Sequence, residues 1–123
     1  MSEKKNIKIP EIGIEIFSID ITEVNWKLAN QIAKEMGEGW RLPSLAELRF
    51  MKGFRDNGIC NFPLYRDFDD AYYWSNKEGE TRNSRTLDKD GRVLYAYFFD
   101  MLEGIESHNK KSYGLRTRLV RDI

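Results

Sequence analysis

The first apolar pattern in the chain has the two-residue period of a strand. Ile12, Ile14 and Ile16 alternate with a glycine and a glutamate, which is the spacing of a strand with one buried face. The largely polar residues before them predict a flexible N-terminus over residues 1–11. We therefore expect one domain over residues 12–123 that opens with this strand.

The next pattern has the period of a helix. Asp20 and Thr22 are suitable N-cap residues, and Gly37 is a natural C-terminal stop, so the first helix should end at about residue 36. Trp26 is expected to pack near its start. The buried face should comprise the apolar residues that are spaced three and four apart: Leu28, Ala29, Ile32, Ala33 and Met36.

Residues 39–48, Gly-Trp-Arg-Leu-Pro-Ser-Leu-Ala-Glu-Leu, predict a tight link into a second helix. Ser44 and Glu47 form the S-x-x-E pattern of a capping box, in which each side chain bonds the backbone amide of the other residue. Pro43 lies just outside the cap, where its missing N–H costs nothing. The buried side of this helix, which should end near Phe54, is marked by apolar residues at helical spacing: Leu45, Leu48 and Met51.

Strand and turn patterns dominate the second half of the chain. Periodicity is lost over residues 55–70, which predicts a long loop. A hairpin turn is expected at Asp-Lys-Asp-Gly, and strands are expected at residues 72–76, 85–87, 93–100 and 113–120. Two helices followed by mostly antiparallel strands predict an α+β domain, in which the opening and closing strands are well placed to pair.

Composition and charge are typical of a soluble globular protein. The 123 residues are 41% hydrophobic and 33% charged. Since 20 basic residues balance 20 acidic ones, neither nucleic acid nor a membrane is expected as a partner. No apolar run resembles a signal peptide or is long enough to span a bilayer, which predicts a cytoplasmic protein, or a mature domain whose leader has been removed.

Four landmark segments occur in order along nearly the whole chain: Trp40-Arg41-Leu42-Pro43-Ser44 with Glu47-Leu48, Tyr73-Trp74-Ser75-Asn76, Ala96 to Gly104, and Arg118-Leu119-Val120-Arg121. In this arrangement the chain resembles the Lcl C-terminal-like family, a bacterial domain family of unclear function. Its members carry W-R-L-P-T-x-x-E-L, Y-W-S-S and V-R-x-V-R patterns. Ser44 stands where threonine is common, which preserves the cap, and Asn76 replaces the second serine of Y-W-S-S.

The resemblance implies the C-type-lectin-like superfamily, with two helices, a small antiparallel sheet and long loops. Formylglycine-generating-enzyme-like (sulfatase-modifying) domains carry a related R-L-P-T-E-x-E-W pattern, but those enzymes rely on a cysteine pair that this chain lacks. The landmark residues are expected to be structural, with Trp40, Leu42 and Trp74 in the core. Arg41 and Arg118 should pair with buried carboxylates or carbonyls, since a guanidinium satisfies several acceptors.

The spacing of reactive residues favours neither catalysis nor metal binding. Cys60 is the only cysteine, which excludes an intrachain disulfide, and no motif links it to His108, the only histidine, which is expected in a solvated loop. The chain is therefore not expected to be an enzyme. Acidic residues at positions 67, 69, 70, 88 and 90 offer oxygens for calcium, but the signatures of calcium-dependent sugar-binding lectins are absent, and no cofactor is expected.

Tyrosine and arginine side chains gather in the second half, where loops and exposed sheet are expected. They offer large contact areas with polar tips, which suits recognition of a protein or a glycan. The candidate binding residues are Tyr65, Asp67, Arg82, Arg85, Tyr95, Tyr97, Asn109 and Tyr113. The pattern at Tyr95 and Tyr97 equally fits half-buried positions on one face of a strand.

The function favoured by these patterns is a non-catalytic binding module whose ligand is unknown. A protein or peptide partner is favoured over a glycan because the calcium-dependent sugar motif is missing. The alternatives are a structural or assembly subunit that self-associates through its aromatic sheet surface and, less favoured, an enzyme of the sulfatase-modifying type. The oligomeric state is left open.

Overall fold

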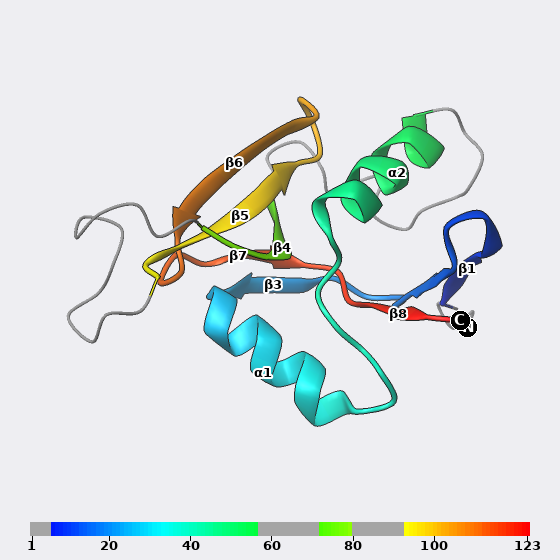
Figure 1. Cartoon of the computed structure of the whole chain (residues 1–123), viewed down its shortest axis with the longest axis horizontal. Coiled ribbons are helices and arrows are strands. Elements are labelled where there is room, and N and C mark those ends of the chain that lie inside the picture. Colours follow the sequence, from blue (N-terminus) through cyan, green and yellow to red (C-terminus); the bar gives the residue numbers. More distant parts are fainter. Residues whose placement is uncertain (1–5, 57–71, 80–92) are drawn as a thin grey trace.

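The computed structural model describes residues 6–56, 72–79 and 93–123, and within these ranges the chain forms two helices and two sheets (Figure 1). The smaller sheet has three antiparallel strands in the order β1 (Ile7–Ile9), β2 (Ile14–Ile16) and β8 (Val120–Asp122). The larger sheet has five strands in the order β3 (Ile21–Val24), β7 (Leu115–Thr117), β4 (Tyr72–Glu78), β5 (Tyr95–Asp100) and β6 (Ile105–Lys110). The predicted α+β architecture is confirmed.

The opening and closing strands pair, as expected. Ile16 of β2 lies opposite Val120 of β8 in an antiparallel ladder. The start of the chain differs from the prediction, because Ile7–Ile9 already form β1 and Pro10 begins a 3₁₀ turn that ends at Gly13. The flexibility expected over residues 1–11 is therefore wrong for β1, whose Ile7 and Ile9 form a short alternation of their own around Lys8.

Helix α1 (Trp26–Met36) begins later than predicted. Its N-cap is Asn25, whose side-chain oxygen accepts a hydrogen bond from the Leu28 amide at 2.8 Å. The residues assigned to the cap, Asp20 and Thr22, instead lead into and form part of β3, which pairs with β7. A good capping side chain was thus present at three positions, and the pairing of β3 with β7 decided which one was used.

The buried side of α1 is narrower than its apolar pattern suggested. Ala29 and Ala33 are fully covered, whereas Leu28 is 41% exposed, so the prediction that it belongs to the buried face is wrong. Trp26 packs against the core at the helix start, as expected, and its indole N–H donates to the Ser75 carbonyl of β4 at 2.8 Å. Gly37 ends the helix with a positive φ of 68°, which glycine adopts without strain.

Helix α2 (Leu45–Asp56) begins with the predicted capping box. The Ser44 amide donates to the Glu47 carboxylate at 2.8 Å, and the Glu47 amide donates to the Ser44 hydroxyl at 3.1 Å. The same carboxylate also accepts two hydrogen bonds from the Arg41 guanidinium, both at 2.8 Å. Arg41 therefore has a carboxylate partner, as expected, although the Glu47 side chain is half-buried rather than buried. Arg41 also links the cap to β8, because it donates to Asp122 at the end of that strand.

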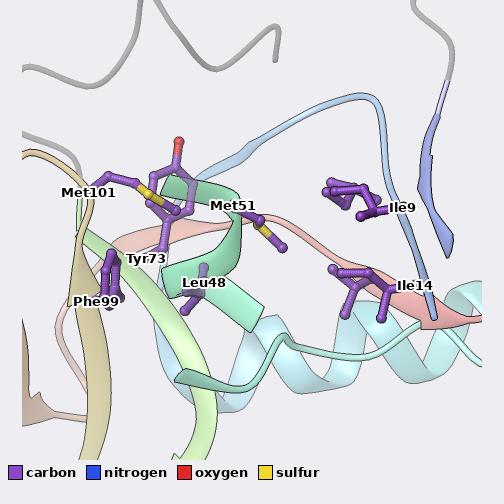
Figure 2. Close-up of a cluster of buried hydrophobic side chains, with 9 residues drawn as sticks. Ile9, Ile14, Leu48, Met51, Tyr73, Phe99 and Met101 are labelled. Carbon is purple, nitrogen blue, oxygen red and sulfur yellow. The ribbon is translucent and has the colours of Figure 1, made fainter. Parts of the chain in front are cut away.

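Two apolar clusters form the core. One joins the two sheets through α2: Figure 2 shows Leu48 and Met51 between Phe99 and Tyr73 on one side and Ile9 and Ile14 on the other. The second cluster lies beneath α1 and contains the three landmark residues that were predicted to be buried, namely Trp40, Leu42 and Trp74. Each helix therefore covers one cluster, α2 with the side that its sequence marked as apolar and α1 with a narrower side around Ala29 and Ala33.

The closing segment is divided between the sheets. A single strand was expected over residues 113–120, but β7 ends at Thr117 in the larger sheet and β8 begins at Val120 in the smaller one. Between them lies Arg118, whose side chain is 2% exposed. Its Nε donates to the Asp20 carboxylate at 2.5 Å and its Nη1 donates to the Phe17 carbonyl at 2.7 Å, which confirms the predicted pairing with buried acceptors.

We expect Trp40→Ala to lower the free energy of unfolding by roughly 3–5 kcal/mol, as for other buried aromatic residues. The indole is 8% exposed, packs edge-to-face on Phe17 and carries the Arg121 guanidinium over its ring. Urea unfolding followed by circular dichroism measures the change. Leu28→Ala on the exposed side of α1 is the control and should change stability by no more than about 0.5 kcal/mol. Equal losses in the two variants would contradict this core.

We also expect stability to fall in acid partly through Glu47. Burial would raise the pKa of this carboxyl, but hydrogen bonds from Arg41 and Ser44 outweigh it and hold the pKa below its ordinary value of 4.5. The unfolded chain therefore takes up the proton first, and the stabilisation present above pH 4.5 is lost as the pH falls through the lower, folded-state pKa.

Glu47→Gln tests this directly because it keeps an acceptor for the cap and removes the charge. The difference in unfolding free energy between wild type and variant, measured in urea across pH, should shrink as the pH falls below the ordinary pKa. A difference that stays constant over the whole range would show that the charge of Glu47 contributes nothing.

Candidate functional site

Strand β5 presents an open surface on one side of the larger sheet. Ala96 and Phe98 are buried on one side of the strand, whereas Tyr95 and Tyr97 are half-buried and point the other way, as alternate residues of a strand must. Farther along the tyrosine side, Phe99 packs in the core cluster that contains α2. The side that carries the tyrosines is therefore covered at one end of β5 and open at the other.

The neighbouring strand β6 was not predicted. It pairs with β5 at all six positions without a bulge. The register places His108 opposite Tyr97 and Lys110 opposite Tyr95. Because opposed residues of an antiparallel pair point to the same side of the sheet, β6 extends the open surface outward from the tyrosines.

Four side chains form one surface here, which we call the aromatic face: Tyr95, Tyr97, His108 and Lys77. The His108 ring lies between the two tyrosines, edge-on to Tyr95 at 5.3 Å and to Tyr97 at 5.8 Å between ring centroids. Edge-to-face packing of this kind orients rings without covering them. His108 is exposed to solvent, as predicted, but it lies on strand β6 and not in a loop, so that part of the prediction is wrong.

Lys77 completes the aromatic face from strand β4. Its Nζ lies 4.7 Å from the centroid of the Tyr97 ring, within the range of a cation–π contact. The ladder between β4 and β5 shifts register between Trp74 and Glu78, and Lys77 lies in that shifted stretch. The irregularity of the strand therefore sets where this cation meets the ring.

Ser75 holds the aromatic face from beneath. It is fully buried; its hydroxyl donates to the Tyr97 carbonyl at 2.8 Å and accepts from the Lys77 amide at 3.2 Å. The adjacent Trp74 donates its indole N–H to the Val24 carbonyl of β3 at 2.9 Å. The Trp-Ser landmark in the sequence thus ties three strands together and fixes the backbone of both Lys77 and Tyr97.

The aromatic face has basic side chains at both ends. Lys77 lies over one tyrosine, and Lys110 lies opposite the other. Two acidic residues of the neighbouring strands are engaged elsewhere: Glu106 pairs with Arg49 of α2, and Glu78 pairs with Lys111 at 2.6 Å. A partner that approaches this surface therefore meets two aromatic rings, an imidazole and positive charge.

The other predicted binding residues do not join this surface. Asn109 lies opposite Ala96 and so belongs to the other side of the sheet, where its side chain accepts from the neighbouring Lys110 amide. Tyr113 is 51% exposed and lies in the turn before β7 rather than in the predicted closing strand. Four further candidates lie outside the described residues: Tyr65, Asp67, Arg82 and Arg85.

Sequence reasoning overlooked His108 and Lys77 as members of the site. Both lie in polar stretches, and β6 shows no apolar alternation that would reveal it as a strand. The available signal was indirect: the glycine at 104 follows β5 closely, and the polar run beyond it has the length needed to pair back along that strand. The partner strand supplied the pattern that β6 itself does not carry.

The described residues contain neither a candidate metal cluster nor a helix that could span a membrane. Residues 6–56, 72–79 and 93–123 contain no group of three or more histidine, cysteine or acidic side chains that could hold a metal ion. Cys60, the acidic residues at 67–70 and 88–90, and the expected hairpin turn lie outside those ranges. No helix that the structure describes is long and apolar enough to cross a membrane.

No family model and no curated protein sequence matches this chain. Solved structures do. Botrocetin superposes with a TM-score of 0.59 at 15% identity over 89% of this chain and 91% of its own. Convulxin, a snake venom toxin, gives 0.62 at 12% identity over 100% and 98%, and EMS16 gives 0.63 at 8% identity over 96% and 97%. The fold is C-type-lectin-like.

The C-type-lectin-like fold agrees with the arrangement expected from the landmark residues, and the coverage extends over nearly the whole of each chain. EMS16 is described as an antagonist of the collagen receptor integrin α2β1. Botrocetin has also been solved in a complex with the A1 domain of a von Willebrand factor mutant, and this structure superposes with a TM-score of 0.58 at 11% identity over the full length of both chains. At these identities the likeness establishes the fold.

Substitution in the aromatic face should cost much less stability than substitution in the core. We expect His108→Ala to cost about 0.2–1 kcal/mol of stability, the range for a cross-strand aromatic contact on an open sheet surface. Phe98→Ala, which empties a buried position of the same hairpin, should cost roughly 3–5 kcal/mol. Urea titrations of the two variants give the comparison, and a loss as large for His108 as for Phe98 would place the imidazole in the core instead.

Proposed function

We propose that this protein is a non-catalytic module that binds a protein partner through the aromatic face. The observation that carries the proposal is the grouping of Tyr95, Tyr97, His108 and Lys77 on one open surface whose backbone is fixed from beneath by Ser75. Tyrosine rings that are already oriented lose little conformational freedom on binding and carry much of the energy in protein interfaces.

The structural neighbours support a protein partner. One is described as an antagonist of an integrin and another is solved in complex with a protein domain, so the same fold presents surfaces to other proteins. The four side chains of the aromatic face also include none of the carboxylates that hold calcium in a calcium-dependent site. We therefore propose binding that needs no metal ion or other cofactor.

The proposal includes kinship with the Lcl C-terminal-like domains of bacteria. The landmarks that carry that resemblance act in the fold: Trp40 and Trp74 lie in the core, and Arg118 joins the two sheets. Such residues are the ones that relatives would share while their binding surfaces diverge. The sulfatase-modifying alternative is not favoured, because a single cysteine cannot supply the pair on which that chemistry relies.

A photo-crosslinking experiment tests the proposed surface before the partner is identified. The crosslinking residue p-benzoylphenylalanine replaces Tyr97 in one variant and Tyr72 in another, and each variant is irradiated in host-cell extract. Tyr72 is the matched control: it is a 41% exposed tyrosine of the same sheet, but it packs on Phe98 and so lies on the opposite side. We expect one discrete protein adduct at position 97 and none at position 72.

The affinity for the captured partner then tests individual residues. Tyr95→Ala and Lys77→Ala should each weaken binding by about tenfold or more, the loss typical of an interface hot spot, while Tyr72→Ala leaves binding unchanged. Titration calorimetry with and without a calcium chelator should give the same affinity. Adducts of equal yield at both positions, or full binding by the double Tyr95→Ala/Tyr97→Ala variant with its melting temperature preserved, would refute the aromatic face as the site.

A further inference from the structure

Strand β6 ends the larger sheet. The strand order is β3-β7-β4-β5-β6, and no strand of the described ranges pairs with the far side of β6, which lies at the outer edge of the hairpin in Figure 1. Edge strands are commonly shielded from further pairing by proline, by bulges, by very short length or by charged side chains, of which β6 has one of each sign, Glu106 and Lys110. β6 is six residues long, contains no proline and keeps an unbroken register with β5.

The ladder shows which backbone groups of β6 face outward. The Lys111 amide donates to the Leu94 carbonyl at 3.0 Å, and these two residues oppose each other in the register that continues from Tyr95 and Lys110. Opposed residues in an antiparallel ladder alternate between bonded and non-bonded pairs. Ser107 and Asn109 therefore bond inward to β5, and the backbone groups of Glu106, His108 and Lys110 point to the open edge.

The end of this edge is closed by the chain itself. The Lys110 amide donates to the Asn109 side chain at 2.9 Å, and the Lys110 carbonyl accepts from the Tyr113 amide at 3.0 Å. The backbone groups that remain on the outer edge of β6 are those of Glu106 and His108. A second strand that satisfies both must place its own outward-facing residues opposite these two.

We propose that β6 pairs antiparallel with β6 of a second copy of this chain, with Glu106 of each copy opposite His108 of the other. This register lets both pairs exchange their two backbone hydrogen bonds. It is also chemically complementary, because each carboxylate faces the imidazole of the other copy, whose ring N–H can donate to it, and has the ammonium of Lys110 as a diagonal neighbour. Glu106 stays within reach of Arg49, to which it already pairs within its own chain.

The dimer leaves the aromatic face open. Side chains of Glu106 and His108 lie on the same side of the sheet as Tyr95 and Tyr97, so the two aromatic faces become one continuous surface across the two-fold axis. The pairing uses the backbone edge of β6 with the side chains of Glu106 and His108, whereas the proposed function can be tested separately through Tyr95, Tyr97 and Lys77. The dimer can therefore fail while partner binding stands, and the reverse also holds.

Amide hydrogen exchange followed by NMR reads the expected pattern directly. As the protein concentration rises, exchange at the Glu106 and His108 amides should slow, whereas the Ser107 amide, bonded to β5, is slow throughout. Sedimentation equilibrium on the same samples should show a reversible monomer–dimer transition. A chain that stays monomeric, or a dimer in which the Glu106 and His108 amides exchange as before, would overturn the proposal.

Charge exchange supplies an independent test of the register. Glu106→Lys removes the carboxylate that faces His108 and places the new lysine diagonal to Lys110 and to the same lysine of the other copy. His108→Glu places two carboxylates opposite each other, so each variant alone should be monomeric. An equal mixture should form a heterodimer, because the lysine introduced in one variant then faces the glutamate introduced in the other. Melting temperatures confirm that both variants are folded, and Tyr72→Ala, which lies on the opposite side of the sheet and away from the edge strand, should dimerise like wild type. Failure of the mixture to dimerise would exclude this register.

Discussion

The structure depends most on the buried guanidinium of Arg118. The chain passes between the two sheets twice, once between β2 and β3 and once between β7 and β8, and these two passages lie side by side through the bond from the Phe17 amide to the Leu119 carbonyl. Arg118 lies on the second passage and bonds the Phe17 carbonyl and the Asp20 carboxylate on the first. A planar group with several fixed donors is suited to hold two backbones together in this way.

The carboxylate at this junction serves a third element. The Tyr73 hydroxyl of β4 donates to Asp20 at 2.6 Å, and burial together with the nearby carboxylate raises the pKa of the phenol well above its ordinary value. The charge of Asp20 is also balanced by Arg116, at 3.6 Å. Because a buried charge without its partners is strongly destabilising, the position of the central strand is coupled to both passages between the sheets.

This coupling explains why the aromatic face can be open and still well ordered. Its strand β5 is bonded to β4. Strand β4 is fixed at Tyr73 by the junction, at Trp74 by a hydrogen bond to β3 and at Ser75 by a hydrogen bond to β5. The rings therefore rest on a backbone that the core holds in place. The aromatic face and the core use different residues of one strand, so the open surface can vary without loss of the core.

Local sequence was sufficient where the interaction is local. Ser44 and Glu47 lie three residues apart, and the cap they form is as predicted. Apolar spacing likewise identified the buried side of α2, and the choice of Trp40 and Trp74 as core residues was correct. In each case the residues that decide the structure are neighbours in the chain, or are large enough that burial dominates every alternative.

Tertiary structure decided whatever depends on a distant partner. Asp20, Thr22 and Asn25 are all good caps, and only the pairing of β3 with β7 selects Asn25. The sequence of β6 carries no strand pattern of its own, and its pairing with β5 is what makes it a strand. The sequence therefore predicted only part of the aromatic face. The spacing of the two tyrosines places them on one side of a strand, whereas Lys77 and His108 reach them through contacts between strands that no local pattern predicts.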